Sequence, residues 1–174
     1  MDLTVEDILK IISHPIVPNA QVTSNGSNSS TLWETKSAGA ILLDLTQTVN
    51  EIKTLTKGIE SPNFLALSPS RFELLRNTRI SEKADTILNA FNNWFPEIHV
   101  ESVKELAGAF QNGTEGFLLG CSEKFNDDND YPIKLTVPDT NHIYRAEWHW
   151  LTLPKRGPID LPAYPLAFSK KYGI

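Results

Sequence analysis

Turn residues divide the stretch from Pro62 to Gly113 into short elements, which makes it the most constraining part of this sequence. Phe64–Leu67 is an apolar run between turn residues, and this pattern predicts a buried strand. Ser68 follows as the predicted N-cap of a helix, with Pro69 at the first helical position, where the missing N–H of proline costs nothing. We therefore expect a strand that passes directly into a helix.

A second helix is predicted over Ser81–Phe95, and Pro96 ends it because proline cannot continue a helix. The apolar residues with helical spacing are Ala84, Ile87, Leu88, Phe91, Trp94 and Phe95. Apolar residues on one helix face ordinarily form core, so this aromatic cluster is interpreted as core and not as a cofactor site. A strand leading into residues 104–108 (KELAG) is expected next.

Helical spacing predicts two further helices upstream of this stretch. Residues 2–12 form a short one, which ends before His14-Pro15 because a residue preceding proline is displaced from the helical region. Ser37–Thr56 is the longest; its first residue is the N-cap, and Lys57-Gly58 is its C-terminal signal. The polar run 21–30 (QVTSNGSNSS) lies between them and predicts a mobile hairpin tip.

The C-terminal third of the chain changes to the period of β-strands, in which successive side chains alternate between two faces. Aromatic and charged residues alternate along Tyr144–Trp150, for example. The strands predicted here are Glu115–Gly120, Ile133–Val137, Tyr144–Trp150 and Ala163–Phe168. Helices and strands do not alternate regularly along the chain, so the predicted fold class is α+β.

Composition argues against several classes of protein. The 174 residues are 40% apolar, enough for one domain with a core, and the single cysteine cannot form an internal disulfide. The net charge of −5 and the lack of a Lys/Arg cluster argue against direct, sequence-specific nucleic-acid binding. No apolar run approaches the roughly 18–20 residues of a membrane span, and no secretory signal is visible. We expect a soluble cytosolic protein, with the sequons at Asn25, Asn28 and Asn112 in loops.

Two places in the C-terminal third could hold a metal ion, and each also has a structural interpretation. His142 and His149, near Asp139 and Glu147, could form a metal site, but recognisable zinc sites show tighter paired spacing. The oxygen-rich loop Asn126–Asp130 could hold calcium, but it lacks the central glycine and the distal glutamate of an EF-hand loop. A solvated acidic turn and a solvated or interfacial histidine are the favoured interpretations.

Nucleophilic catalysis and nucleotide binding are not indicated. The sequence contains neither a nucleophile-elbow glycine pattern nor a glycine-rich phosphate-binding motif. Cys121 follows a predicted strand and is expected to be a buried, inert thiol, because reactive cysteines need an electropositive setting. We therefore assign no catalytic, cofactor-binding or metal-binding residue.

Several segments, taken in order, resemble the major capsid proteins of tailed phages and prophages. The matching pieces are DILKIISHP (7–15), the helix from Ser37 to Gly58, the strand and Ser-Pro helix at 62–76, Glu105–Gly108, and RGPI (156–159) leading to PLA (165–167). Strands, capped helices and turns recur in many proteins, so the order and spacing of these pieces carry the resemblance. It covers most of the chain.

The resemblance implies an A-domain-like mixed sheet with flanking helices, joined to strands of a peripheral domain. On this basis, residues 1–36 are a peripheral-domain-like lead-in with a flexible loop, 37–153 are the A-domain-like core, and 154–174 are a return segment with the C-terminal strand. The chain resembles only the C-terminal part of such a protein and is expected to lack the N-terminal arm, the extended loop and the spine helix.

The function implied by the resemblance is structural. The chain would be a phage or prophage major capsid subunit, or a truncated remnant, that self-assembles through A-domain contacts without enzyme activity or cofactor. Its partners would be copies of itself in a capsomer ring and other phage head proteins, in the virion or the bacterial host cytoplasm. Two alternatives stay open: a small metal-dependent hydrolase that uses His142 and His149, and a module whose strand Tyr144–Trp150 docks a peptide by edge pairing.

Overall fold

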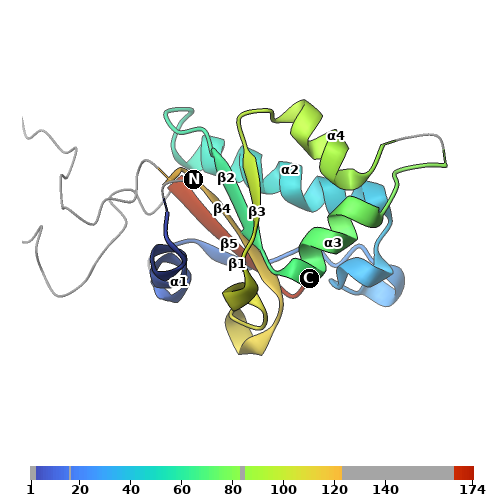
Figure 1. The fold of residues 1–174 in the computed structure, drawn as a ribbon, viewed down its shortest axis with the longest axis horizontal. Coiled ribbons are helices and arrows are strands. Elements are labelled where there is room, and N and C mark those ends of the chain that lie inside the picture. Colours follow the sequence, from blue (N-terminus) through green and yellow to red (C-terminus); the bar gives the residue numbers. More distant parts are fainter. Residues whose placement is uncertain (1–2, 16, 83–84, 123–166) are drawn as a thin grey trace, which may run out of the picture.

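A mixed five-stranded sheet organises the computed structural model, which describes residues 3–15, 17–82, 85–122 and 167–174 (Figure 1). The order across the sheet is β1-β5-β4-β2-β3. The strands are β1 (Asn19–Gln21), β2 (Phe64–Leu67), β3 (His99–Ser102), β4 (Gly116–Gly120) and β5 (Phe168–Tyr172). Sequence-distant segments therefore become neighbours, and β5 lies between β1 and β4.

Antiparallel pairing in the middle of the sheet is flanked by parallel pairing at both edges. β4 pairs antiparallel with β2, with Leu65 opposite Leu119, and antiparallel with β5, with Leu118 opposite Lys170. β2 pairs in parallel with β3, and β5 pairs in parallel with β1. Parallel neighbours need crossover connections, and the segment from β2 to β3 makes one with α3 and α4.

A polar residue occupies the N-cap position of each described α-helix. The helices are α1 (Val5–Ser13), α2 (Ala38–Leu55), α3 (Pro69–Asn77) and α4 (Ile87–Trp94). The side chain of the N-cap residue caps α1, α2 and α4. Thr4 and Asp7 form a reciprocal capping box on α1, while the hydroxyls of Ser37 and Thr86 accept from backbone N–H groups at the start of α2 and α4. Such caps satisfy N–H groups that have no partner within the helix.

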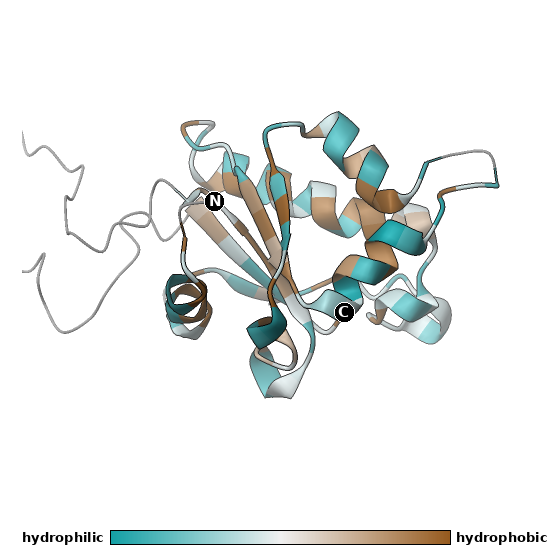
Figure 2. Cartoon of the chain, viewed as in Figure 1, coloured by the Kyte–Doolittle hydropathy of each residue, from teal (hydrophilic) through white to brown (hydrophobic). Residues whose placement is uncertain are grey.

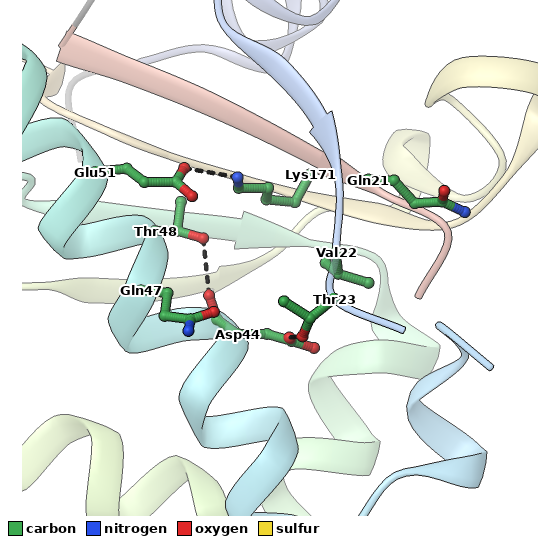
Figure 3. Close-up of a pocket in the computed structure, with 8 residues that line it drawn as sticks. All are labelled: Gln21, Val22, Thr23, Asp44, Gln47, Thr48, Glu51 and Lys171. Carbon is green, nitrogen blue, oxygen red and sulfur yellow. Dashed lines mark hydrogen bonds and ion pairs between the residues drawn. The ribbon is translucent and has the colours of Figure 1, made fainter. Parts of the chain in front are cut away.

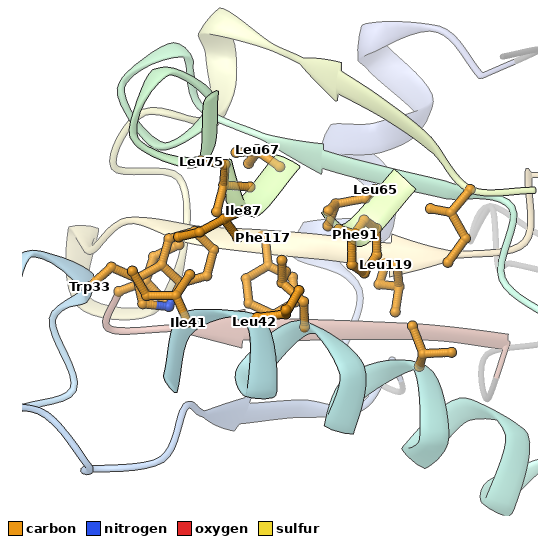
Figure 4. Packing of buried hydrophobic residues seen from close by; sticks show 14 of the residues in the cluster. Trp33, Ile41, Leu42, Leu65, Leu67, Leu75, Ile87, Phe91, Phe117 and Leu119 are labelled. Carbon is orange, nitrogen blue, oxygen red and sulfur yellow. The ribbon is translucent and has the colours of Figure 1, made fainter. Parts of the chain in front are cut away.

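Two apolar clusters lie on opposite faces of the sheet, because side chains alternate along each strand. Leu65, Leu67, Phe117 and Leu119 point to the face covered by α2, α3 and α4, where they pack with Trp33, Ile41 and Phe91 (Figure 4). Phe64, Ala66, Leu118 and Phe168 point to the other face and pack with Ile8 and Ile11 of α1. Figure 2 shows the same arrangement, with apolar residues on the strands and on helix faces turned inward.

Both ends of β4 are glycines, because neighbouring groups leave no room for a side chain. A Cβ atom on Gly116 would lie 2.2 Å from the carbonyl oxygen of Lys171 and 2.5 Å from the ring of Phe110. A Cβ atom on Gly120 would lie 2.5 Å from the ring of Phe168. Glycine at these positions therefore lets β5 and its flanking side chains lie close to β4.

A buried polar network joins the 23–36 segment to α2. The carboxylate of Asp44 accepts from the ammonium of Lys36 at 2.6 Å, from Trp33 Nε1 at 2.9 Å and from Thr23 Oγ1 at 2.7 Å. Lys36 Nζ also donates to the Thr23 carbonyl oxygen at 2.6 Å. The Lys36 and Asp44 side chains are 0% and 1% exposed, so each charge depends on the other for compensation.

Several predicted elements are confirmed. The long helix capped by Ser37 and the predicted strands Phe64–Leu67 and Glu115–Gly120 form within one residue of the predicted bounds, and the short first helix, predicted over residues 2–12, spans Val5–Ser13. Gly58 adopts a positive φ of 77°, as the predicted C-terminal signal requires, and Lys57 before it also has a positive φ, of 55°. These elements have clear local signals at both ends.

The predicted helix Ser81–Phe95 is wrong at its start. α4 begins after Thr86, because the preceding turn is closed by an Arg79–Thr86 bridge and by hydrogen bonds from Ile80 N to Asp85 O and from Ile87 N to Thr78 O. The interpretation of its aromatic residues as core holds for Phe91, but Trp94 is 61% exposed. Trp94 follows the helical spacing of the inward residues, but it is the last residue of α4 and lies at the margin of the core.

The predicted hairpin around 21–30 is also wrong, since β1 pairs in parallel with β5 and the following polar run forms turns that include η1 (Ser27–Ser29). The last described strand, Phe168–Tyr172, continues four residues beyond the predicted end of Ala163–Phe168, and residues 163–166 of that prediction lie outside the described residues. Ser68 occupies the N-cap position of α3, but its hydroxyl does not cap and donates to Glu115 Oε2 at 2.5 Å. The predicted strands Ile133–Val137 and Tyr144–Trp150 lie outside the described residues.

Substitution of two aromatic residues on α4 tests the position of the core. Phe91→Ala should lower the free energy of unfolding by about 3–5 kcal/mol, because it opens a cavity among fully buried side chains. Trp94→Ala should change it by about 0.5 kcal/mol or less, as exposed substitutions generally do. Urea unfolding of both variants measures the difference, and equal losses would show that Trp94 is part of the core after all.

Removal of one charge from the buried network gives a second prediction. Asp44→Ala leaves the Lys36 ammonium buried without its counter-ion and should lower the free energy of unfolding by about 3–5 kcal/mol. Arg76→Ala is the control, because Arg76 pairs with Glu73 on the exposed side of α3 and should cost less than about 1 kcal/mol. Chemical denaturation compares the two, and a cost for Asp44→Ala no larger than that of the control would contradict the role of the network.

Candidate functional site

The predicted metal-site candidates do not come together in the part of the chain that the structure describes. His142, His149, Asp139, Glu147 and the loop Asn126–Asp130 all lie outside the described residues. Within residues 3–15, 17–82, 85–122 and 167–174, no group of three or more His, Cys, Asp or Glu side chains is placed to hold a metal ion. The assignment of no catalytic, cofactor-binding or metal residue stays a prediction.

The two described histidines occupy different settings. His14 is the buried C-cap residue of α1, while His99 is exposed at the start of the edge strand β3. His14 belongs to the corner where α1 meets β5, and His99 pairs with Phe64 of β2 through the backbone.

Cys121 is buried, as the sequence predicts. It follows β4, is 3% exposed, and its thiol donates to the carbonyl oxygen of Ser61 at 2.7 Å. A thiol in this position links the end of β4 to the loop before β2. Its burial restricts access by an electrophile or a metal ion.

A shallow pocket lies where α2 crosses β1 and β5 (Figure 3). Its lining residues are Gln21, Val22, Thr23, Asp44, Gln47, Thr48, Glu51 and Lys171. Polar groups from one face of α2 meet the edge of the sheet here.

The charged groups of this pocket are already compensated. Glu51 pairs with Lys171 Nζ at 2.6 Å, and Asp44 is held by Lys36, Trp33 and Thr23. Thr48 Oγ1 donates to the backbone oxygen of Asp44 at 2.8 Å. General acid–base or nucleophilic chemistry needs a reactive group paired with an activating one, and these groups hold the fold instead.

Sequence reasoning missed this network, although a signal was present. Asp44 lies between Ile41 and Thr48 on the inward stripe of α2, where a carboxylate is unexpected. A buried carboxylate needs a cationic or hydrogen-bonding partner, and Lys36 lies directly before the N-cap of the same helix. The pair could have been inferred from this spacing, but the contribution of Thr23 could not.

The corner between α1 and β5 contains two buried titratable groups. Lys170 Nζ donates to the backbone oxygens of Ile12 at 3.0 Å and His14 at 2.8 Å. Burial lowers the pKa of Lys170 from its ordinary value. Burial also lowers the pKa of His14, and the positive charge of Lys170 lowers it further.

Surfaces offer the remaining candidates for contacts with other molecules. β1 and β3 are the edge strands of the described sheet, and most of their residues are exposed or half-buried. The large apolar side chains that remain exposed are Val5, Leu9, Leu32, Leu43, Leu55, Ile59, Ile80 and Trp94. Ile59, which follows α2, and Trp94, at the end of α4, are the most exposed of these. No helix in the described ranges is long and apolar enough to cross a bilayer.

Comparison with known proteins gives a clear result at the level of the family. Residues 7–142 match the model of the family described as major capsid protein. A comparison with curated proteins finds no match.

Among solved structures, the chain is similar to one described as the capsid of Myoviridae Phage XM1, with a TM-score of 0.52 and 10% sequence identity. The similarity covers 64% of this chain and 36% of that chain, so the chain spans little more than a third of the length of this structural relative. At such low identity the likeness concerns the fold alone, and it confirms the predicted capsid-type α+β arrangement. Since the family model matches well over half of the sequence, the chain belongs to the major capsid protein family.

Proposed function

We propose that the chain is a structural subunit of a phage or prophage head that assembles with copies of itself through A-domain contacts. The observation that carries the proposal is the family match over residues 7–142, in a chain whose described fold is similar to that of a phage capsid structure. The virion is the proposed location of the assembled protein, after synthesis in the bacterial host cytoplasm. Other phage head proteins are proposed as further partners.

The described domain has properties that suit repeated contacts. Its strands β2 and β4 are buried throughout, and an apolar cluster covers each face of the described sheet. The surface of the described residues, which includes the exposed apolar side chains of Ile59 and Trp94, is where contacts between subunits would form. Heterologous contacts between such surfaces close into rings when the rotation between neighbours allows it.

The proposed division of the chain follows the family resemblance. Residues 1–36 would be the peripheral-domain-like lead-in, 37–153 the A-domain-like core, and 154–174 the return segment. β1 and β5 come from the first and last of these segments and complete one sheet with β2, β3 and β4. The lead-in and the return segment would thus support the core that makes the subunit contacts.

A structural role without enzyme activity is the corresponding proposal for chemistry. Family membership favours it, and the polar groups of the α2 pocket are used in ion pairs and hydrogen bonds. The hydrolase alternative depends on His142 and His149, and the peptide-binding alternative on Tyr144–Trp150. These residues lie outside the described ranges, and no observation favours either alternative.

Measurement of mass in solution tests self-assembly directly. We expect light scattering with size-exclusion chromatography to show discrete oligomers that grow with protein concentration and dissociate on dilution, because ring contacts obey mass action. Electron microscopy of the largest species should show closed rings or shell fragments.

Two controls separate specific assembly from aggregation and from the alternatives. The destabilised variant Phe91→Ala identifies aggregation, which would increase in the variant and would not reverse on dilution. A monomer at every concentration would contradict the proposal. Metal-dependent hydrolase activity that is lost in His142→Ala and His149→Ala would replace it with the enzyme alternative.

A further inference from the structure

Three exposed apolar side chains lie at one end of the sheet. Leu55 ends α2 and Ile59 lies in the connection from α2 to β2, while Trp94 ends α4 shortly before β3. β2 and β3 are parallel, with Phe64 opposite His99, so both connections reach the sheet at the same end (Figure 1). Leu55, Ile59 and Trp94 are 46%, 80% and 61% exposed, and we call them the end patch.

A hydrogen-bonded turn holds Ile59 in its exposed position. Gly58 N donates to Lys53 O at 2.6 Å, and Ile59 N donates to Thr56 O at 3.1 Å. Glu60 N donates to Thr56 Oγ1 at 3.2 Å. An apolar residue beside such a helix terminus frequently packs back on the helix, but the Ile59 side chain stays in solvent. Because the turn is fixed by these bonds, contact with a partner would cost Ile59 little conformational freedom.

Trp94 is also held at a fixed position. The next residue, Phe95, is the C-cap of α4; its N–H donates to Phe91 O at 2.9 Å, and its ring centroid lies 5.2 Å from that of the buried Phe91. Tryptophan is among the residues that contribute most to protein–protein contacts. Large apolar side chains that gather at one exposed place are typical of an interaction surface.

The part of the end patch that comes from α2 is basic. Lys53 and Lys57 flank it in the sequence; Lys57 is exposed, and Lys53 Nζ lies 6.0 Å from the centroid of the Phe95 ring. Glu97, an exposed acid, follows the other part of the patch. A partner surface with an apolar centre and an acidic side chain beside it would match the α2 part in both respects.

The outer side of α1, formed by Val5, Glu6 and Leu9, has this composition. Val5 and Leu9 are 42% and 36% exposed and lie one helical turn apart on the same face. The Glu6 side chain between them is 81% exposed, since its pair with Lys10 is long, at 3.8 Å. α1 packs on the face of the sheet opposite to α2 and α4, so its outer side and the end patch are separate surfaces.

We propose that the end patch of one copy of this chain binds the outer side of α1 of a second copy, with Lys57 of one beside Glu6 of the other. Two different surfaces meet in this contact, so each copy can bind one neighbour through each surface, and the arrangement can repeat around a ring. The inference rests on the proposed function, because the partner is another copy of the chain, and it adds which surfaces meet.

Alteration of the end patch tests the contact in the full chain. Light scattering over a concentration series gives the concentration at which half of the protein is assembled. Ile59→Ser and Trp94→Ala should each raise it about ten-fold or more, as loss of a central apolar contact does. The matched control is Leu43→Ser, which removes a side chain of 45% exposure from the middle of α2 and should change it about two-fold or less.

Urea unfolding of the same variants separates the possible outcomes. Unchanged stability with weakened assembly supports the proposal. Unchanged assembly would overturn it and leave the proposed function standing; if stability also fell, another part of the same chain would be the occupant of the patch. A wild-type chain that is monomeric at every concentration would instead contradict the proposed function.

Charge reversal tests the pairing of the two surfaces. At low salt, Lys57→Glu and Glu6→Lys should each weaken assembly about two- to five-fold, as expected for a pair at the margin of a contact. The double variant should regain most of the loss, because the two charges again have opposite signs. Structural damage from the two changes would add instead of cancelling. A double variant that assembles no better than either single variant would overturn the proposal.

Discussion

The position of β5 between β1 and β4 is the constraint on which the rest of the structure depends. β1 has β5 as its neighbour in the described sheet, so the N-terminal segment joins the domain through a strand from the other end of the chain. Side chains of β5 also make contacts on both faces of the sheet. Phe168 and Lys170 contact α1 and the segment that follows it on one face, while Lys171 pairs with Glu51 of α2 on the other. Gly116 and Gly120 give β5 room to lie against β4. Loss of this pairing would therefore expose both apolar clusters together.

Local signals were sufficient to predict the elements that depend on local interactions. The long helix α2 has a polar N-cap, a regular apolar stripe and a Lys57-Gly58 terminus, and it forms as predicted. β2 was predicted because a short apolar run is bounded by turn residues. The start of α4 was wrong because Ser81 and Thr86 are both acceptable caps, and a backbone turn between Thr78 and Ile87 decides between them. Helical spacing likewise could not show that Trp94, the last residue of α4, is exposed at the margin of the core.

The position of β5, the last described strand, could not be predicted for a different reason. Its sequence, FSKKY, contains two adjacent lysines and has the character of an exposed segment, whereas both lysines are buried in the structure. Each finds a specific partner on a different face of the sheet: carbonyl oxygens at the end of α1 for Lys170, and the carboxylate of Glu51 for Lys171. Those partners lie far away in the sequence, so neither propensity nor periodicity could identify them. The candidate metal and peptide-docking residues of the C-terminal third remain predictions.

Three lysines are buried among the described residues, and they differ in how their charge is balanced. Lys36 and Lys171 each lie within 2.6 Å of a carboxylate, which compensates much of the cost of taking an ammonium group out of water. Lys170 is bound by backbone carbonyl groups, which carry only partial charge. Lys170 is thus held by backbone dipoles, and burial lowers its pKa from the ordinary value. The apolar clusters on the two faces of the sheet are thus joined to the N-terminal segment and to α2 by buried polar contacts as well as by apolar packing.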